Sequence, residues 1–460
     1  MSSKRKEVGN GNCRVIPCDM VWTMVFAIVL YFFWRMGAAC YMSYHEQLQL
    51  FLWTGDYFTE RIVEPGGLVR YVSEFVVQYY NNFNVGALLL VILFVALQRL
   101  TLVIIRRNAK GGHLIWSYLP ALLFIAIMGD ANVITTALMS FVATTGLIVL
   151  LPYDGRWRVI YNCFVATLGY WFVGPMVIGV LIFSLVETLC NGATIRKTIG
   201  EIIPFGVIIT MVVTTLYIVP YRLVDLVIGI DYYRLSEGCL MVYSGIVIVV
   251  LLPLVALIRW RRVVEISVAV AMVSCLLVVW PMRYMTEEAR RLKCDLLVRT
   301  NRWSELVQVS AEDRECNDAT QLVAYALAQW HNGQRTSEAL ISYIAKHKDL
   351  NNLTYLSIIS EAYLSMGMVN ASQRYAFELK ELIPNHNNSG RFISRLAETA
   401  LVSGRKELAE KYIYVLSHAP FYKKKAERLR ELVENKELLN RHKTYGPLQG
   451  SFPENDVIFH

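Results

Sequence analysis

Nine long apolar runs fill the first 281 residues of this 460-residue chain, and a more polar region follows them. A helix of about 20 apolar residues spans the hydrocarbon core of a bilayer, where the backbone can bond only to itself. We therefore expect an all-α protein, with a bundle of about nine transmembrane helices followed by a soluble helical region. The predicted spans are 20–41, 85–105, 114–128, 133–151, 159–173, 176–190, 199–219, 240–258 and 264–281. The fifth and sixth are short, so the number of spans between 159 and 190 stays open.

The formal net charge of +8 indicates membrane topology rather than a nucleic-acid partner, because the basic residues gather in turns beside the spans. Cytoplasmic turns are enriched in Lys and Arg. A cytoplasmic N-terminus places all four basic turns inside, and an odd number of spans then places everything after residue 281 outside. The basic residues of the four turns are Arg106, Arg107, Lys110, Arg156, Arg158, Arg196, Lys197, Arg259, Arg261 and Arg262.

This topology divides the chain into a cytoplasmic N-terminus, a transmembrane domain, a repeat domain and a tail. Three outer connections are expected on one side of the membrane, at 42–84, 129–132 and 220–239. In a Gram-negative cell the repeat domain would lie in the periplasm, anchored to the inner membrane. The expected domain bounds are 1–19, 20–281, 282–440 and 441–460.

The region after residue 281 has the spacing of tetratricopeptide (TPR) repeats. Gly333, Gly367 and Gly404 are separated by 34 and 37 residues, and the TPR period is 34. Asn301 takes the turn of an earlier, degenerate unit, so four repeats are predicted from 286 to 422. Such a stack leaves a concave groove that typically holds a peptide or partner protein. A scaffold without a ligand is the alternative. The residues from 445 to 460 lack helical periodicity, and we expect them to be poorly ordered.

The second half of the outer loop 42–84 reads as an amphipathic helix. Pro65, Gly66 and Gly67 break the chain before it, and apolar residues then recur at helical spacing. A helix of this kind lies along a membrane surface with its apolar face in the lipid.

Acidic residues cluster near the outer membrane boundary. Glu46, Asp56 and Asp130 are the candidate catalytic residues, because carboxylates gathered at a dry interface can act as a base or hold a divalent metal. Glu46 and Asp130 are the candidate ligands of a metal such as Mg or Mn. Solvation of ordinary loop acids is the alternative for all but Glu46, since an acid so near the end of a span is costly unless it is paired or used.

Three further residues are candidates for substrate binding. His45 lies beside Glu46, and Arg222 and Arg234 lie in the third outer connection, where guanidinium groups match phosphate oxygens. Anchoring at the interface is the equally ordinary reading of these arginines. Glu187 lies inside the sixth span and is either functional or paired near the cytoplasmic end with Arg196 or Lys197.

Two resemblances follow from the run YHEQLQLFLWTGDYF, the run EPGGLVRYVSEFVVQYY and the layout of spans and repeats. The chain resembles a family of uncharacterised polytopic proteins common in Bacteroidota, which implies a Gram-negative inner membrane. Its layout is also similar to that of GT-C glycosyltransferases, which use polyprenyl-phosphate-linked sugars. This second resemblance implies an acid in the first outer loop, Glu46 or Asp56, and another in the next, Asp130.

Three classes of function compete. The first is a transferase of lipid-linked sugar, with the outer acids in its site and the repeats presenting the acceptor. The second is a non-catalytic membrane anchor whose repeats recruit envelope or secretion proteins. The third, a transporter, needs an ionisable relay through the bundle, for which Glu187 is the single candidate.

Overall fold

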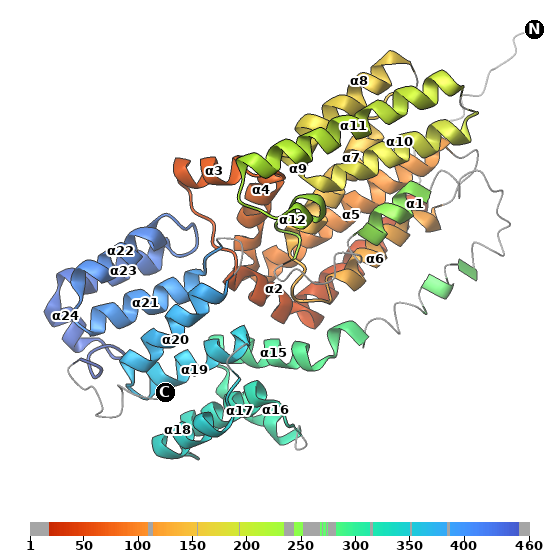
Figure 1. The fold of residues 1–460 in the computed structure, drawn as a ribbon. Coiled ribbons are helices and arrows are strands. Elements are labelled where there is room, and N and C mark those ends of the chain that lie inside the picture. Colours follow the sequence, from red (N-terminus) through yellow and green to blue (C-terminus); the bar gives the residue numbers. More distant parts are fainter. Residues whose placement is uncertain are drawn as a thin grey trace, which may run out of the picture.

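The chain forms an elongated helical bundle and a curved array of helix pairs, which meet at α2 and α15 (Figure 1). The computed structural model describes residues 18–108, 114–153, 155–192, 194–233, 243–251, six positions between 267 and 274, 282–312, 316–349, 352–383 and 387–449. Every regular element within these residues is a helix. The one extended pairing among them is an isolated antiparallel bridge between Val133 and Tyr233. The predicted all-α class is confirmed.

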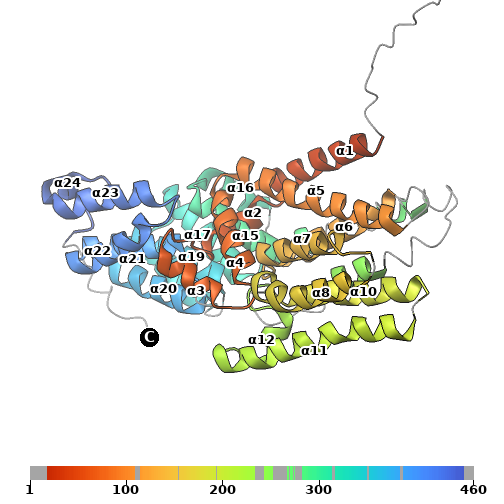
Figure 2. The same cartoon turned by 90° about the horizontal axis from the view of Figure 1, so that it is seen from above.

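The bundle is built from residues 18–228. Its helices are α1 (Cys18–Phe32), η1 (Phe33–Gly37), α2 (Ala39–Gln47), α3 (Gly55–Ile62), α4 (Gly67–Gln78), η2 (Tyr79–Asn81), α5 (Phe83–Asn108), η3 (Ile115–Tyr118), α6 (Leu119–Ile127), α7 (Thr135–Val149), α8 (Arg156–Phe164), η4 (Val165–Gly169), α9 (Tyr170–Val173), η5 (Pro175–Val177), α10 (Ile178–Cys190), α11 (Ile195–Ile218) and α12 (Leu223–Ile228). Seen from above, they follow one another from α1, through α5 and α7, to α11 (Figure 2).

Three of the described helices are long and apolar enough to cross a membrane. They are Asp19–Gly37, Phe83–Arg107 and Ile195–Ile218. Shorter apolar helices at Ile115–Ile127, Thr135–Val149 and Pro175–Cys190 cover three more predicted spans, and the predicted fifth span is divided among α8, η4 and α9. The predicted eighth and ninth spans, 240–258 and 264–281, lie largely outside the described residues. The structure thus supports several membrane-compatible helices but not the full count of nine.

The three predicted outer connections lie together at one end of the bundle. The backbone N–H of Ile134 donates to the Tyr232 carbonyl at 3.2 Å, which ties the second connection to the third. Arg70 of α4 forms a buried ion pair with Asp231, which ties the first to the third. These contacts bring the three connections together, and their location on one side of a membrane stays a prediction.

Helix α4 forms where the sequence predicts it, and the face that it buries in the protein is the polar one. Arg70, Ser73, Glu74 and Gln78 are buried, whereas Leu68 is 40% exposed. Arg70 and Glu74 are ion-paired at 3.2 Å, and Glu74 also accepts from Arg61 of α3 at 3.0 Å. These partners explain why the polar face is buried, because paired charges can be buried when each has its counter-ion. Contact of the apolar face with lipid stays a prediction.

After Thr286 the chain forms helix pairs in succession. They are α15 (Glu287–Arg299) with α16 (Trp303–Glu312), α17 (Ala319–His331) with α18 (Ser337–Lys346), α19 (Leu353–Ser365) with α20 (Val369–Leu382), α21 (Gly390–Val402) with α22 (Lys406–Ser417), and α23 (Lys423–Glu434) with α24 (Lys436–Arg441). The predicted repeat limits, 286 and 422, are the N-cap residues of α15 and α23.

Four of these pairs turn on a residue in the left-handed region. Gly333, Gly367 and Gly404 have φ values of 73°, 85° and 74°, and Asn301 has φ 54°. Glycine adopts this conformation without strain, and asparagine is among the few other residues that tolerate it. The four turn positions predicted from sequence spacing are confirmed.

The extended segment 48–53 of the outer loop is built into the helix-pair array. Leu48 packs into the core formed by α15, α17 and α19, and Leu50 into that of α21 to α23. The backbone of Leu50 donates to Asn388 at 2.8 Å, and that of Trp53 donates to His418 at 2.9 Å. Part of the predicted membrane-proximal loop is therefore a structural element of the array.

The chain after α24 folds back on the array rather than leaving it at once. Tyr445 and Leu448 pack against a small apolar cluster formed by Leu364, Val369 and Val402. The prediction of a poorly ordered tail is therefore wrong for residues 445–449. Residues 450–460 lie outside the described part of the chain.

Candidate ligand pocket of the helix-pair array

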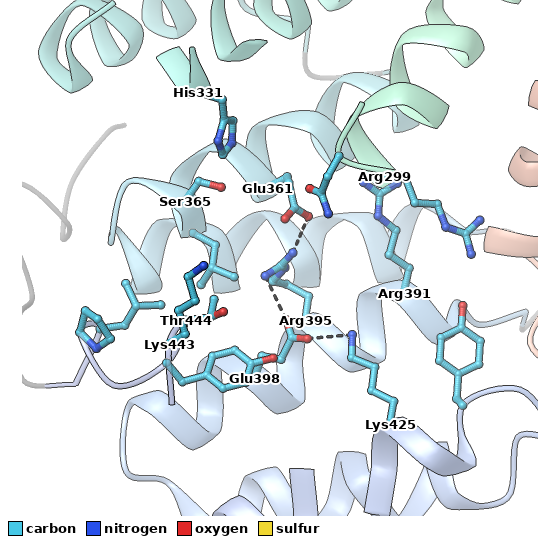
Figure 3. Close-up of a pocket in the computed structure, with 16 residues that line it drawn as sticks. Arg299, His331, Glu361, Ser365, Arg391, Arg395, Glu398, Lys425, Lys443 and Thr444 are labelled. Atoms are coloured by element: carbon cyan, nitrogen blue, oxygen red, sulfur yellow. Dashed lines mark hydrogen bonds and ion pairs between the residues drawn. The ribbon is translucent and has the colours of Figure 1, made fainter. Parts of the chain in front are cut away.

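A cavity of about 710 Å³ opens on the side of the array formed by the first helix of successive pairs (Figure 3). This volume lies within the range of ligand pockets in proteins. Helices α15, α17, α19, α21 and α23 contribute to its wall, and the segment 443–448 closes one side. The lining is Arg299, Asn301, His331, Glu361, Leu364, Ser365, Arg391, Arg395, Glu398, Tyr422, Lys425, Lys443, Thr444, Tyr445, Pro447 and Leu448.

Alternating charges run across this pocket from α19 to α23. Arg395 pairs with Glu361 and, at 3.0 Å, with Glu398, which in turn pairs with Lys425 at 2.7 Å (Figure 3). Burial disfavours the charge of Glu398, but Lys425 and Arg395 more than offset this effect and lower the pKa of that carboxyl to about 2. The chain of ion pairs holds three helices together and leaves both donors and acceptors along the wall.

Arg391, which lines the same pocket, has a side-chain donor without a partner. Its Nη1 donates to Asp295 Oδ1 at 2.9 Å and also to Gln47. Its Nη2 is buried and has no acceptor among the described residues. A buried guanidinium nitrogen without an acceptor is costly, so this position favours a ligand that brings a carboxylate or carbonyl oxygen.

Glu46, the strongest candidate from the sequence, lies directly behind this pocket. Its side chain is buried, with Oε2 accepting from Arg299 at 2.6 Å and Oε1 from the Tyr422 hydroxyl at 3.0 Å. Burial opposes the charge of Arg299, but Glu46 and Tyr422 reverse the balance and raise the pKa of the guanidinium. Burial and the charge of Glu46 raise the pKa of Tyr422. Glu46 thus joins the bundle to both ends of the array.

The other predicted catalytic residues have surroundings of their own. Asp56 is exposed in the first turn of α3. Asp130 lies in a turn, where Oδ1 accepts from the backbone of Asn132 at 2.9 Å. Burial, followed by the charge of Asp130, raises the pKa of Glu288, so the carboxylate that Asp130 faces is on α15.

The predicted metal and substrate ligands can be located in part. Within the described residues no group of three or more His, Cys, Asp or Glu side chains is arranged to hold a metal ion. His45 is buried with Nε2 3.2 Å from the Ala131 carbonyl oxygen, and Arg222 is exposed and paired with Asp225 at 3.3 Å. Arg234 lies outside the described residues. A metal site at Glu46 and Asp130 stays a prediction.

Glu187 belongs to a second buried cluster at the opposite end of the bundle. Arg107 pairs with it at 3.2 Å and Arg158 at 2.9 Å. The predicted pairing with Arg196 or Lys197 stays a prediction. Arg158 also pairs with Glu201 at 3.0 Å. The cluster balances two arginines against two acids, which is how buried charges are tolerated. It lies at one end of the bundle and does not form a relay through it.

A model of a family of unknown function, DUF6057, matches residues 14–460. The chain belongs to this family. No curated protein and no solved structure matches the chain. Because the match begins before α1 and continues beyond the array, the bundle and the array of this DUF6057 member form one family unit rather than two separate modules.

Sequence reasoning missed the pocket residues of this DUF6057 chain. Arg391, Arg395 and Glu398 are spaced at i, i+4 and i+7, and therefore share one face of α21. Ser394, Ala397 and Leu401 are also buried on that helix. Charged residues that recur at helical spacing on a helix with a wide buried face are the signal that could have indicated the pocket.

Proposed function

We propose that the chain is a membrane-anchored binding protein whose helix-pair array is TPR-like and takes a carboxylate-bearing peptide segment of a partner protein. The observation that carries this proposal is the pocket of about 710 Å³ with the unpartnered, buried Nη2 of Arg391 in its wall. TPR stacks bind extended or helical peptides on the face formed by their first helices.

The composition of the wall favours a peptide over a compact polyanion. Glu361 and Glu398 would repel a phosphate or sulfate, but both can accept hydrogen bonds from peptide N–H groups. Arg391 and Lys443 supply charge for a side-chain or terminal carboxylate, and Leu364 and Leu448 supply apolar contact. This mixture of donors, acceptors and apolar surface matches the repeating chemistry of a polypeptide.

The membrane part of the proposal extends the three long apolar helices to the full predicted topology. It places nine spans in a bacterial inner membrane, the N-terminus in the cytoplasm and the array in the periplasm. The polar turns of the bundle support it, since Arg107, Arg158 and Lys197 lie at one end and the outer connections at the other.

Site-specific photo-crosslinking in cells tests the binding function. A benzophenone amino acid at Ser365, in the pocket, should give a discrete adduct with a second protein. The same amino acid at Tyr414, which is 62% exposed on α22, should not. Lys443→Glu should weaken the adduct at Ser365, because it places a negative charge beside the ligand carboxylate.

The matched control is Lys411→Glu, which changes an exposed lysine of α22 that does not line the pocket. Equal adducts in the two lysine variants would contradict the assignment of the pocket. The absence of any adduct specific to Ser365 would also contradict it.

Transfer of a lipid-linked sugar is the alternative function, and the geometry supports it less. A general base or metal ligand must be within reach of the substrate, whereas Glu46 is buried. Both oxygens of Glu46 accept hydrogen bonds from Arg299 and Tyr422. The transferase hypothesis therefore rests on Asp56 and Asp130, and it stays a prediction.

A further inference from the structure

A second cavity, of about 310 Å³, lies between the start of α8, the end of α10 and the start of α11. Four basic side chains line it: Arg156, Arg158, Arg196 and Lys197. Glu201 is the one acid among its described lining residues. The end of α10 and the start of α11 lie at the end of the bundle far from the array (Figure 2), so the cavity is there too.

Glu201 is already neutralised within the protein. Its oxygens accept from Arg158 at 3.0 Å, from Asn162 at 2.9 Å and from Ser184 at 2.6 Å. Arg158 is buried in making these contacts, whereas Arg156 and Arg196 are exposed. Among the described lining residues, the wall therefore carries an excess of positive charge that faces solvent.

The position of these cations conflicts with the electrostatics of their helices. Arg156 and Arg158 lie in the first turn of α8, and Arg196 and Lys197 in the first turn of α11; neither turn contains an acid. The amino end of a helix carries partial positive charge and favours anions, so cations there are unfavourable. An anion bound between the two helix starts would remove the conflict.

The surface around the cavity is apolar. Trp157, Ile195 and Ile199 are each more than half exposed, at 73%, 80% and 57%. Ile195 and Ile199 belong to the candidate span Ile195–Ile218, whereas Trp157 is on α8. Only 22% of this span is buried within the protein. A cationic cavity at the end of an exposed apolar helix matches both parts of a phospholipid.

We propose that this cavity binds the headgroup phosphate of an acidic phospholipid, with the acyl chains lying along the exposed face of α11. The inference rests on the membrane location proposed above. The membrane location and the lipid site can fail separately. Extraction of membranes at alkaline pH tests whether the protein is embedded in a membrane, whatever lipid it binds.

Lipid binding by the full-length protein, purified in a neutral detergent, tests the proposal. Fluorescent phosphatidylglycerol should bind at least tenfold more tightly than phosphatidylcholine. Each basic residue near an anionic lipid contributes a factor of roughly five, so the double variant Arg196→Gln/Lys197→Gln should bind phosphatidylglycerol roughly tenfold to thirtyfold more weakly. Arg156→Gln alone should show a smaller loss, which keeps the test valid if the double variant does not fold.

Arg106→Gln is the matched control, because Arg106 is an exposed arginine at the same end of the bundle that does not line the cavity. It should bind phosphatidylglycerol as the parent does. Equal binding in all variants, or no preference over phosphatidylcholine, overturns the proposal. Binding of glycerol phosphate as tight as that of the lipid also overturns it, because the site would then take a soluble anion.

Discussion

Glu46 shows how a buried partner changes the role of a carboxylate. From the sequence it is an acid beside a membrane span, and such an acid is either paired or used. The structure pairs it with Arg299, 253 residues away, and with Tyr422, 376 residues away. Both partners belong to the array, so this residue couples two parts of the chain that the hydropathy pattern separates.

Glu46→Gln should therefore destabilise the whole protein. Removing one partner of a buried ion pair leaves the other charge uncompensated, which costs about 3 to 5 kcal/mol. Thermal unfolding of the full-length protein in detergent measures the loss. Asp56→Asn changes an exposed acid of the same loop and should shift stability by less than about 0.5 kcal/mol. Parental stability in Glu46→Gln would remove the structural role and restore the catalytic hypothesis.

Glu398 makes the array sensitive to acid. Its pKa in the folded protein, about 2, is below its ordinary value of 4.5, so the ionised form stabilises the fold. That contribution is fully present above pH 4.5 and is lost as the pH falls toward 2. It amounts to at most about 3 kcal/mol, reduced because Lys425 is 44% exposed and screened by solvent.

Melting temperatures measured from pH 7 to pH 2 test this prediction. Glu398→Gln should be less stable than the parent at pH 7 and should lose less stability on acidification. Glu410→Gln, an exposed acid of α22, should follow the parental curve. Parallel curves for the parent and Glu398→Gln would show that this carboxyl does not titrate as described.

At the scale of elements, the segment 48–53 is the least expected part of the fold. Its LQLFLW run is too short for a span and has no helical periodicity. It is extended because its backbone bonds to Asn388 and His418, and its apolar side chains fill the cores of the helix pairs. Because Leu48 and Leu50 fill part of these cores, the array depends on the segment 48–53 for its stability.

Leu50→Ala should consequently weaken the array, although Leu50 lies far from it in sequence. Truncation of a buried leucine costs about 2 to 5 kcal/mol. Trp53→Ala should have little effect, because the Trp53 side chain is 66% exposed. Limited proteolysis of the full-length variants measures the difference, and cleavage in the array should accelerate for Leu50→Ala alone. Equal cleavage rates would mean that the segment is only resting on the surface.

Local features were predictable from the sequence, and distant pairings were not. The turns at Asn301 and Gly404 follow from the backbone conformation that a tight turn needs, which one residue can indicate. The polar buried face of α4 depends on Asp231, which is 161 residues beyond Arg70, and nothing in the α4 sequence indicates that partner. Helical periodicity alone therefore identifies the apolar face of α4 but not the partners of its polar face.

At the scale of the whole molecule, two polar clusters lie at opposite ends of an apolar bundle. Arg107, Arg158 and Glu187 form one, and Arg70, Glu74 and Asp231 form the other. Their separation by helices α5, α7 and α10 is what a bilayer requires, because charged groups are excluded from its hydrocarbon core.

Reporter fusions test which end faces the cytoplasm. Alkaline phosphatase is active only outside the cytoplasm, so a fusion after Thr300 should be active and a fusion after Arg107 inactive. Basic residues retained on the cytoplasmic side are the physical reason. The opposite pattern would invert the topology, and equal activity at both sites would contradict the membrane crossing between them.

The bonds from residues 46–53 to residues 388–422 also govern how the protein is made. A ribosome adds about 5 to 20 residues per second, so the 376 residues between Glu46 and Tyr422 take roughly 20 to 75 seconds to synthesise. Glu46 has neither partner until Arg299 has been made, and Leu50 has no core to enter until α21 to α23 have been made. A chain that stops before α21 lacks the helices α21 to α23, against which Leu50 of the segment 48–53 packs. Quality-control proteases should therefore recognise truncated products by an unfolded segment close to their start.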